Sequence, residues 1–65
     1  MKCSKEKFIR LMKENFYNNA TLAEKMGVNV TTVSKLKNGK TEPHAETLRK
    51  LCDALKCAPG DILED

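Results

Sequence analysis

No stretch of this sequence approaches the run of roughly 18 apolar residues that a membrane-spanning helix requires. The first seven residues lack the apolar core of a signal peptide, so we expect a cytoplasmic protein. Internal repeats, low-complexity segments and linkers are absent as well. A chain of 65 residues with this organisation is expected to fold as a single domain over residues 1–65, with a core of modest size.

Residues that build catalytic or metal sites are scarce. The chain has one histidine, His44, and three cysteines without a Cys-x-x-Cys spacing, so a zinc site has too few ligands and no cofactor is expected. We interpret Cys52 as a buried thiol and expect Cys3 to be exposed. The Ser-x-x-Lys spacing of residues 4–7 lacks its companion motifs, and paired carboxylates and a Gly-rich phosphate loop are missing. These absences predict that the protein is not an enzyme.

Alternation of apolar and polar residues, the mark of a strand, is also missing, and the apolar residues recur three or four positions apart. This spacing predicts an all-α fold. The expected helices cover residues 5–14, 19–26, 30–37, 45–56 and 59–63. Asn15 is a candidate left-handed residue after the first helix. We interpret the aromatic residues Phe8, Phe16 and Tyr17 as core.

The segment 19–38 is the most informative part of the chain, because it predicts two short helices joined by a tight turn. Gly27 follows the first helix, where a left-handed residue is needed and glycine takes that conformation without steric cost. Asn29 stands where an N-cap opens the second helix. The apolar positions of the segment, which are expected to converge on one core, are Leu22, Ala23, Met26, Val28, Val33 and Leu36.

The outward face of the second helix in this segment is polar. Stepping about 100° per residue from the inward Val33 places hydroxyl, amide and ammonium groups on the opposite face. The residues on or beside this face are Val30, Thr31, Ser34, Lys35, Lys37 and Asn38. Groups of these kinds can bind both phosphates and the base edges of a major groove.

Positive charge lies towards the N-terminal part of the chain. Residues 1–27 carry six basic and three acidic side chains, and residues 28–44 carry three lysines and one glutamate. Residues 45–65 carry three basic and five acidic side chains, so the net charge changes from +3 and +2 to −2 along the chain. This asymmetry fits one face towards a polyanion, although a solvated Lys-rich surface explains the charge equally well.

The segment 19–38 resembles the helix-turn-helix of the phage Cro/repressor, or Xre, family. That motif has a small residue at its fifth position, glycine at its ninth, and apolar residues at the fourth, eighth, tenth, fifteenth and eighteenth. Counted from Asn19, the chain matches at all of them, and its residues 38–43, N-G-K-T-E-P, resemble the loop that follows the motif. The chain departs from the family at Asn19, often Gln, at Phe16, often Gly, and at His44, usually Ser.

The resemblance implies a five-helix lambda-repressor-like domain of a bacterial or phage transcriptional regulator, interpreted as a repressor that occupies an operator on double-stranded DNA. The implied base-reading residues are Val30, Thr31, Ser34 and Lys35. The implied contacts to the DNA backbone are Asn18, Asn19, Thr32, Lys37, Asn38, Lys40 and Thr41. A homodimer is expected, formed through the fourth helix and residues 59–63, with no small-molecule ligand.

The same fold can also serve as an antitoxin or another module that binds a partner protein. An adaptor of this kind is expected to carry an acidic or apolar outer face on the third helix. The polar and basic face in this chain therefore favours DNA.

Overall fold

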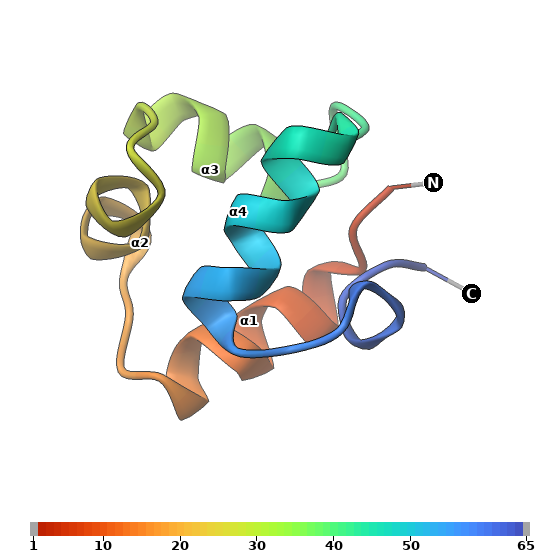
Figure 1. The fold of residues 1–65 in the computed structure, drawn as a ribbon, viewed down its shortest axis with the longest axis horizontal. Helices are drawn as coiled ribbons and strands as arrows, with labels where there is room; N and C mark the ends of the chain where they lie inside the picture. The colour runs from red at the N-terminus through yellow and green to blue at the C-terminus, as the bar shows by residue number, and fades with distance from the viewer. Residues whose placement is uncertain (1, 65) are drawn as a thin grey trace.

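The computed structural model describes residues 2–64 and is built from helices (Figure 1). The elements are α1 (Lys5–Glu14), α2 (Asn19–Met26), α3 (Val30–Lys37), α4 (Ala45–Leu55) and a short 3-10 helix, η1 (Pro59–Asp61). The all-α prediction is confirmed for this part of the chain, where the only extended pairing is an isolated antiparallel bridge between Cys3 and Leu63. No helix within residues 2–64 has the length and apolar character to cross a membrane.

The predicted fifth helix, residues 59–63, is wrong, because residues 2–64 form four α-helices and only the three-residue η1 at this point. The carboxylate of Asp61 accepts a hydrogen bond from the backbone N–H of Ala58 at 3.0 Å, which closes a single turn. The chain then leaves the helical conformation so that Ile62 enters the core, where it is fully buried. Its carbonyl accepts a bond from the backbone N–H of Ser4 at 2.8 Å.

The predicted end of the fourth helix is one residue too late. The sequence predicts a helix over residues 45–56, whereas α4 ends at Leu55. Lys56 follows it in the left-handed conformation, with φ 55°. A left-handed residue cannot continue a right-handed helix, so it marks the end of α4.

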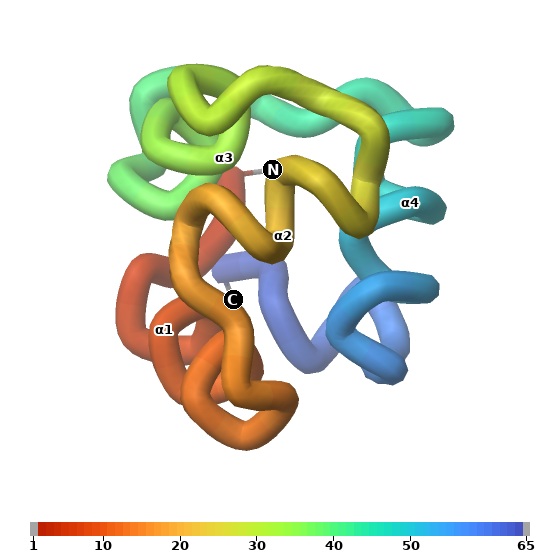
Figure 2. Tube along the Cα trace, turned by 90° about the vertical axis from the view of Figure 1, so that its left-hand side faces the viewer, coloured from red at the N-terminus to blue at the C-terminus, as the bar shows by residue number. Residues whose placement is uncertain are grey.

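The core lies between the four α-helices. Figure 2 shows α2 in front of the molecule, with α3 above it, α1 below it and α4 beside it. The largest fully buried side chains are Phe8, Val33, Leu22, Leu36, Leu51, Leu55 and Ile62. Cys52 is also buried, as predicted. All helices therefore contribute to one core, and α3 is held with its opposite face towards solvent.

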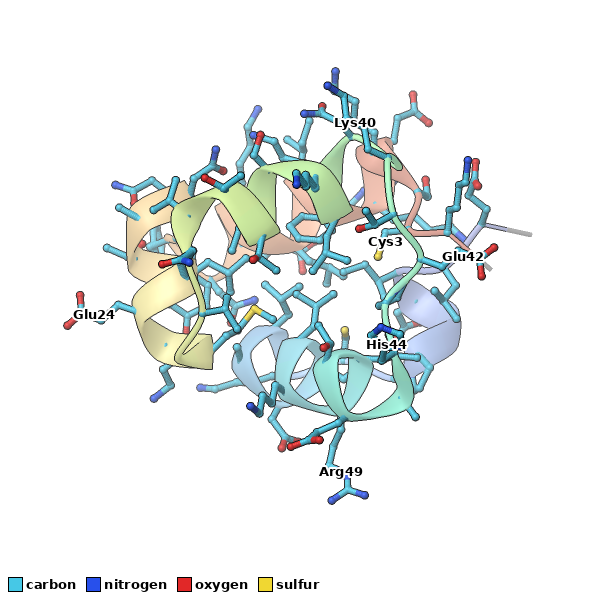
Figure 3. The ribbon with its side chains drawn as sticks, turned by 90° about the horizontal axis from the view of Figure 1, so that it is seen from above. Cys3, Glu24, Lys40, Glu42, His44 and Arg49 are labelled. Atoms are coloured by element: carbon cyan, nitrogen blue, oxygen red, sulfur yellow. The ribbon has the colours of Figure 1, made fainter. Side chains whose placement is uncertain are left out.

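The two ends of the described chain pair with each other, and this explains why Cys3 is buried rather than exposed. Its side chain is only 2% exposed and points inward in Figure 3. The backbone N–H of Glu64 donates to the carbonyl of Lys2 at 2.9 Å, and Lys7 Nζ donates to the carbonyl of Leu63 at 3.1 Å. These bonds hold residue 3 under the C-terminal segment. Sequence spacing does not reveal a contact between residues so far apart in the chain.

The turn between α1 and α2 differs from both predictions made for it. Phe16 is the left-handed residue, with φ 59°, and its side chain is 94% exposed rather than part of the core. Asn15 instead stays at φ −100°, and its Nδ2 donates to the carbonyls of Leu11 and Leu55 at 2.8 and 3.1 Å. Tyr17 packs against the core. Phe16 thus occupies the position at which the resembled family often has glycine.

Candidate nucleic-acid interface

The start of α2 is closed by a reciprocal capping box, in which Asn18 is the N-cap. The backbone N–H of Thr21 donates to Asn18 Oδ1 at 2.8 Å, and the backbone N–H of Asn18 donates to Thr21 Oγ1 at 2.8 Å. Both groups are exposed. A capped helix start is a defined, electropositive surface, because the helix dipole places partial positive charge there.

The turn between α2 and α3 has the predicted left-handed glycine. Gly27 lies at φ 73° and ψ 32°, and the backbone N–H of Val28 donates to the carbonyl of Ala23 at 2.9 Å. This pattern is the Schellman motif, which ends a helix and satisfies its last carbonyls. Asn29 then opens α3 in an extended conformation, although its side chain makes no capping bond. The turn sets the direction in which α3 leaves α2.

The predicted inward and outward faces of α3 are confirmed by burial. Val33 and Leu36 are buried, whereas Thr31 and Lys35 are exposed. The remaining polar residues of this face are the half-buried Ser34 and the exposed Asn38, joined by a bond of 3.5 Å from Asn38 Nδ2 to Ser34 Oγ. α3 is therefore a solvent-facing ridge with hydroxyl, amide and ammonium groups along its crest.

A groove of about 570 Å³ runs along one flank of this ridge. We call it the α2-side groove, and its lining residues are Ile9, Met12, Lys13, Tyr17, Asn18, Asn19, Ala20, Val30 and Lys37. Three of the predicted backbone contacts, Asn18, Asn19 and Lys37, meet here with the base-reading candidate Val30, which is 46% exposed. The groove has an apolar floor and amide and ammonium groups around it.

A second, more polar hollow of about 250 Å³ lies along the other flank, between α3 and the start of α4. We call it the loop-side groove, and its lining residues are Thr32, Lys35, Leu36, Thr41, Glu42, Pro43, His44 and Thr47. It brings together the candidates Thr32, Lys35 and Thr41. The candidates that line neither groove are Thr31, Ser34, Asn38 and Lys40.

Lys40 lies in the loop after α3, on the edge of the molecule away from α4. Figure 3 shows its side chain at this edge, whereas Arg49 projects from α4 at the opposite edge. The loop is shaped by Gly39, at φ 70°, and by a bond of 3.0 Å from the Lys40 backbone N–H to the Lys35 carbonyl. Lys40 is thus placed near the C-terminal end of the α3 ridge.

Lys37 and Asn19 are in direct contact. Lys37 Nζ donates to Asn19 Oδ1 at 3.1 Å, which ties the last turn of α3 to the first residue of α2. The sequence places both residues among the backbone contacts but does not predict this bond. The two helices that form the motif are therefore joined by a polar bond as well as by the core.

The sequence does not predict that residues of α1 line the α2-side groove. Lys13 lies in the last turn of α1, and Ile9 lies one turn before it. Helical spacing shows that Lys13 faces solvent, but it does not show which other helix lies beside it. Only the tertiary structure brings Lys13 into the same groove as Asn18 and Asn19.

Comparison with known proteins agrees with this geometry. The family model of the Cro/C1-type HTH DNA-binding domain matches residues 7–65 of the chain. The chain belongs to this family. The Cro/C1-type match includes α1 to α4 and η1 apart from the first residues of α1, so both grooves fall within it.

This Cro/C1-type domain also has a curated relative. It is 48% identical over 44 residues to a protein of Bacillus subtilis (strain 168) described as the uncharacterized HTH-type transcriptional regulator YozG. The alignment covers 66% of this chain and 52% of that relative, so the chain matches about half the relative's length. No solved structure gives a significant match to the chain.

Proposed function

We propose that the chain is a sequence-specific regulator of transcription, which binds double-stranded DNA and represses by occupying an operator. The observation that carries the proposal is the α3 ridge between two grooves whose linings include amide, hydroxyl and ammonium side chains. A B-DNA major groove is about 12 Å wide, admits one α-helix and has a phosphate backbone on either side. A ridge that reads bases, with phosphate-binding groups on both flanks, complements this shape.

The place of each side chain supports the assignment of its role. Thr31, Ser34 and Lys35 lie on the crest or its loop-side edge, where they can reach base edges, and Val30 can contact a thymine methyl group. The groups assigned to the DNA backbone on the α2 side are Asn18 and Asn19, next to the start of α2. The groups assigned to it at the other flank and the helix end are Thr32, Asn38, Lys40 and Thr41.

A homodimer completes this proposal. One module of this size contacts few base pairs, whereas two modules related by a two-fold axis can bind half-sites about 34 Å apart. The surface we assign to the interface is α4 with residues 59–63. Its exposed carboxylates Glu46, Asp53 and Asp61 balance the exposed cations Arg49, Lys50 and Lys56, so it is less positive than the α3 ridge and less suited to DNA.

Selection of bound sites from a random double-stranded DNA pool tests the proposal. The expected result is an enriched two-fold symmetric site whose half-site centres are about one helical turn apart. A reporter with this site across its promoter should be repressed when the chain is expressed. Failure to enrich any sequence would contradict sequence-specific binding, and enrichment without repression would contradict the repressor role alone.

A further inference from the structure

The bond between Lys37 and Asn19 carries an inference that rests on the proposed function and deepens it. The two residues are 18 positions apart, yet Lys37 Nζ and Asn19 Oδ1 are separated by 3.1 Å. Both side chains are half-buried in the wall of the α2-side groove. The contact lies where α2 begins, beside the capping residue Asn18.

This bond determines which way the Asn19 amide faces. An ammonium group has only donors, so Lys37 can bond the oxygen of the amide and never its nitrogen. Because the amide is planar, holding Oδ1 towards Lys37 turns Nδ2 away from Lys37. Within residues 2–64, Nδ2 of Asn19 has no hydrogen-bond partner. The amide therefore presents two free N–H donors at the start of α2.

We propose that Lys37 is a positioning residue, which acts on DNA through Asn19 rather than by its own contact with a phosphate. It orients Nδ2 of Asn19 so that its N–H groups can donate to a phosphate, and it holds the start of α2 in place beside the end of α3. Without Lys37, the short amide can rotate, and ordering it again on binding costs side-chain entropy. This assignment replaces the direct backbone contact that the sequence predicts for Lys37.

The test is a double-mutant cycle on DNA affinity with Lys37→Met, Asn19→Ala and the double variant, using the site selected for the wild-type chain. Loss of one hydrogen bond of this kind corresponds to roughly three- to tenfold in affinity. Lys37→Met should weaken binding by about that factor in the wild-type background and by less than about twofold with Asn19→Ala. Its salt slope should match that of the wild type, because no phosphate contact of Lys37 is lost.

The variant Asn19→Asp keeps the oxygen that accepts from Lys37 but removes the N–H donors of the amide. The aspartate still accepts from Lys37, and a carboxylate suits the first turn of a helix, so the melting temperature should not fall. It offers no N–H donor and repels phosphate, so its affinity should fall at least as far as that of Asn19→Ala. An Asn19→Asp variant that binds DNA as tightly as the wild type overturns the proposal.

Equal losses for Lys37→Met in both backgrounds, with a salt slope lower by about 0.9, show that Lys37 binds a phosphate itself and overturn the proposal. An unchanged affinity for Lys37→Met overturns it too. If Lys37→Met does not fold, Lys37→Gln is used instead, because it changes the packing less. An unchanged salt slope for Lys37→Gln supports the proposal, and a slope lower by about 0.9 overturns it. A wild-type chain that selects no DNA site is a different result, which refutes the proposed function instead.

Discussion

Asn18 and Thr21 each accept a hydrogen bond from the other's backbone N–H, both at 2.8 Å, so the start of α2 is closed from both sides. Asn29 holds the corresponding place before α3, but its side chain makes no such bond. Asn18 and Asn29 stand at equivalent positions before the two helices of the motif, and they therefore differ in what they contribute to stability.

This difference predicts unequal costs for the same substitution. Asn18→Ala should lower the free energy of unfolding by about 1 kcal/mol, because it leaves a helix N–H without its acceptor. For a chain of this size, that corresponds to a fall of about 4–8 °C in melting temperature. Asn29→Ala is the matched control and should change the melting temperature much less. Equal effects, measured by thermal denaturation, would contradict the role given to the capping box.

Phe16 should be replaceable by glycine with a gain in stability. Its φ of 59° strains any residue that has a side chain, and its ring is 94% exposed, so little packing is lost. Phe16→Gly should raise the free energy of unfolding by about 0.5–1 kcal/mol, after the greater entropy of glycine in the unfolded chain is subtracted. Phe16→Ala keeps the strain and should show no comparable gain. A less stable Phe16→Gly chain would show that the ring makes a stabilising contact.

Replacing Gly27 should lower the free energy of unfolding, whereas Phe16→Gly should raise it. A Cβ added to Gly27 has no heavy atom within 4 Å, so the cost of Gly27→Ala comes from its φ of 73° and not from a clash. We expect a loss of about 1 kcal/mol, and a larger one for the β-branched Gly27→Val. Gly60 is the control, because its added Cβ is equally free and its φ is not in the left-handed region. If Gly27→Ala and Gly60→Ala melt alike, the left-handed turn is not what requires glycine.

The free energy of unfolding should fall in alkaline solution because the Cys57 thiol ionises more readily in the unfolded chain. Burial, together with the nearby thiol of Cys52, raises the pKa of Cys57 from 9.0 to about 12. The unfolded chain releases this proton near its ordinary pKa, so the thiol's stabilising effect is complete below about pH 8.5 and declines as pH rises towards the folded pKa. Urea unfolding of the wild type and of Cys57→Ala, from pH 8 upward, should give a shallower decline for the variant. Parallel declines would show that Cys57 does not contribute.

The motif itself could be predicted from the sequence because its determinants are local. Gly27, the apolar positions three and four apart and the polar face of α3 are all visible within twenty consecutive residues. Helix periodicity then places each residue on a face. The ranges expected for the first three helices are those that the structure shows.

The remaining features depend on contacts between distant segments. Cys3 is buried because the C-terminal segment lies over it, and Lys37 meets Asn19 because α2 and α3 cross at a particular angle. Phe16 breaks the local rule that a left-handed residue is glycine or asparagine, so the sequence predicts the left-handed residue at Asn15 instead. Lys13 joins the α2-side groove only through the packing of α1.

The contrast between Lys35 and Lys40 tests most directly whether α3 reads DNA sequence. Lys35 is exposed on α3 and can donate to guanine O6 or N7, whereas Lys40 lies beyond the helix end, where we assign it to a phosphate. The measurement is the affinity of Lys35→Ala and Lys40→Ala for the selected site and for scrambled DNA at several salt concentrations. Lys35→Ala should lose about 1–3 kcal/mol on the selected site and relax the preference at one base pair. Lys40→Ala should weaken both DNAs equally and lower the salt slope by about one unit. Equal losses on both DNAs for Lys35→Ala would contradict sequence reading by Lys35 and leave that role to Thr31 and Ser34.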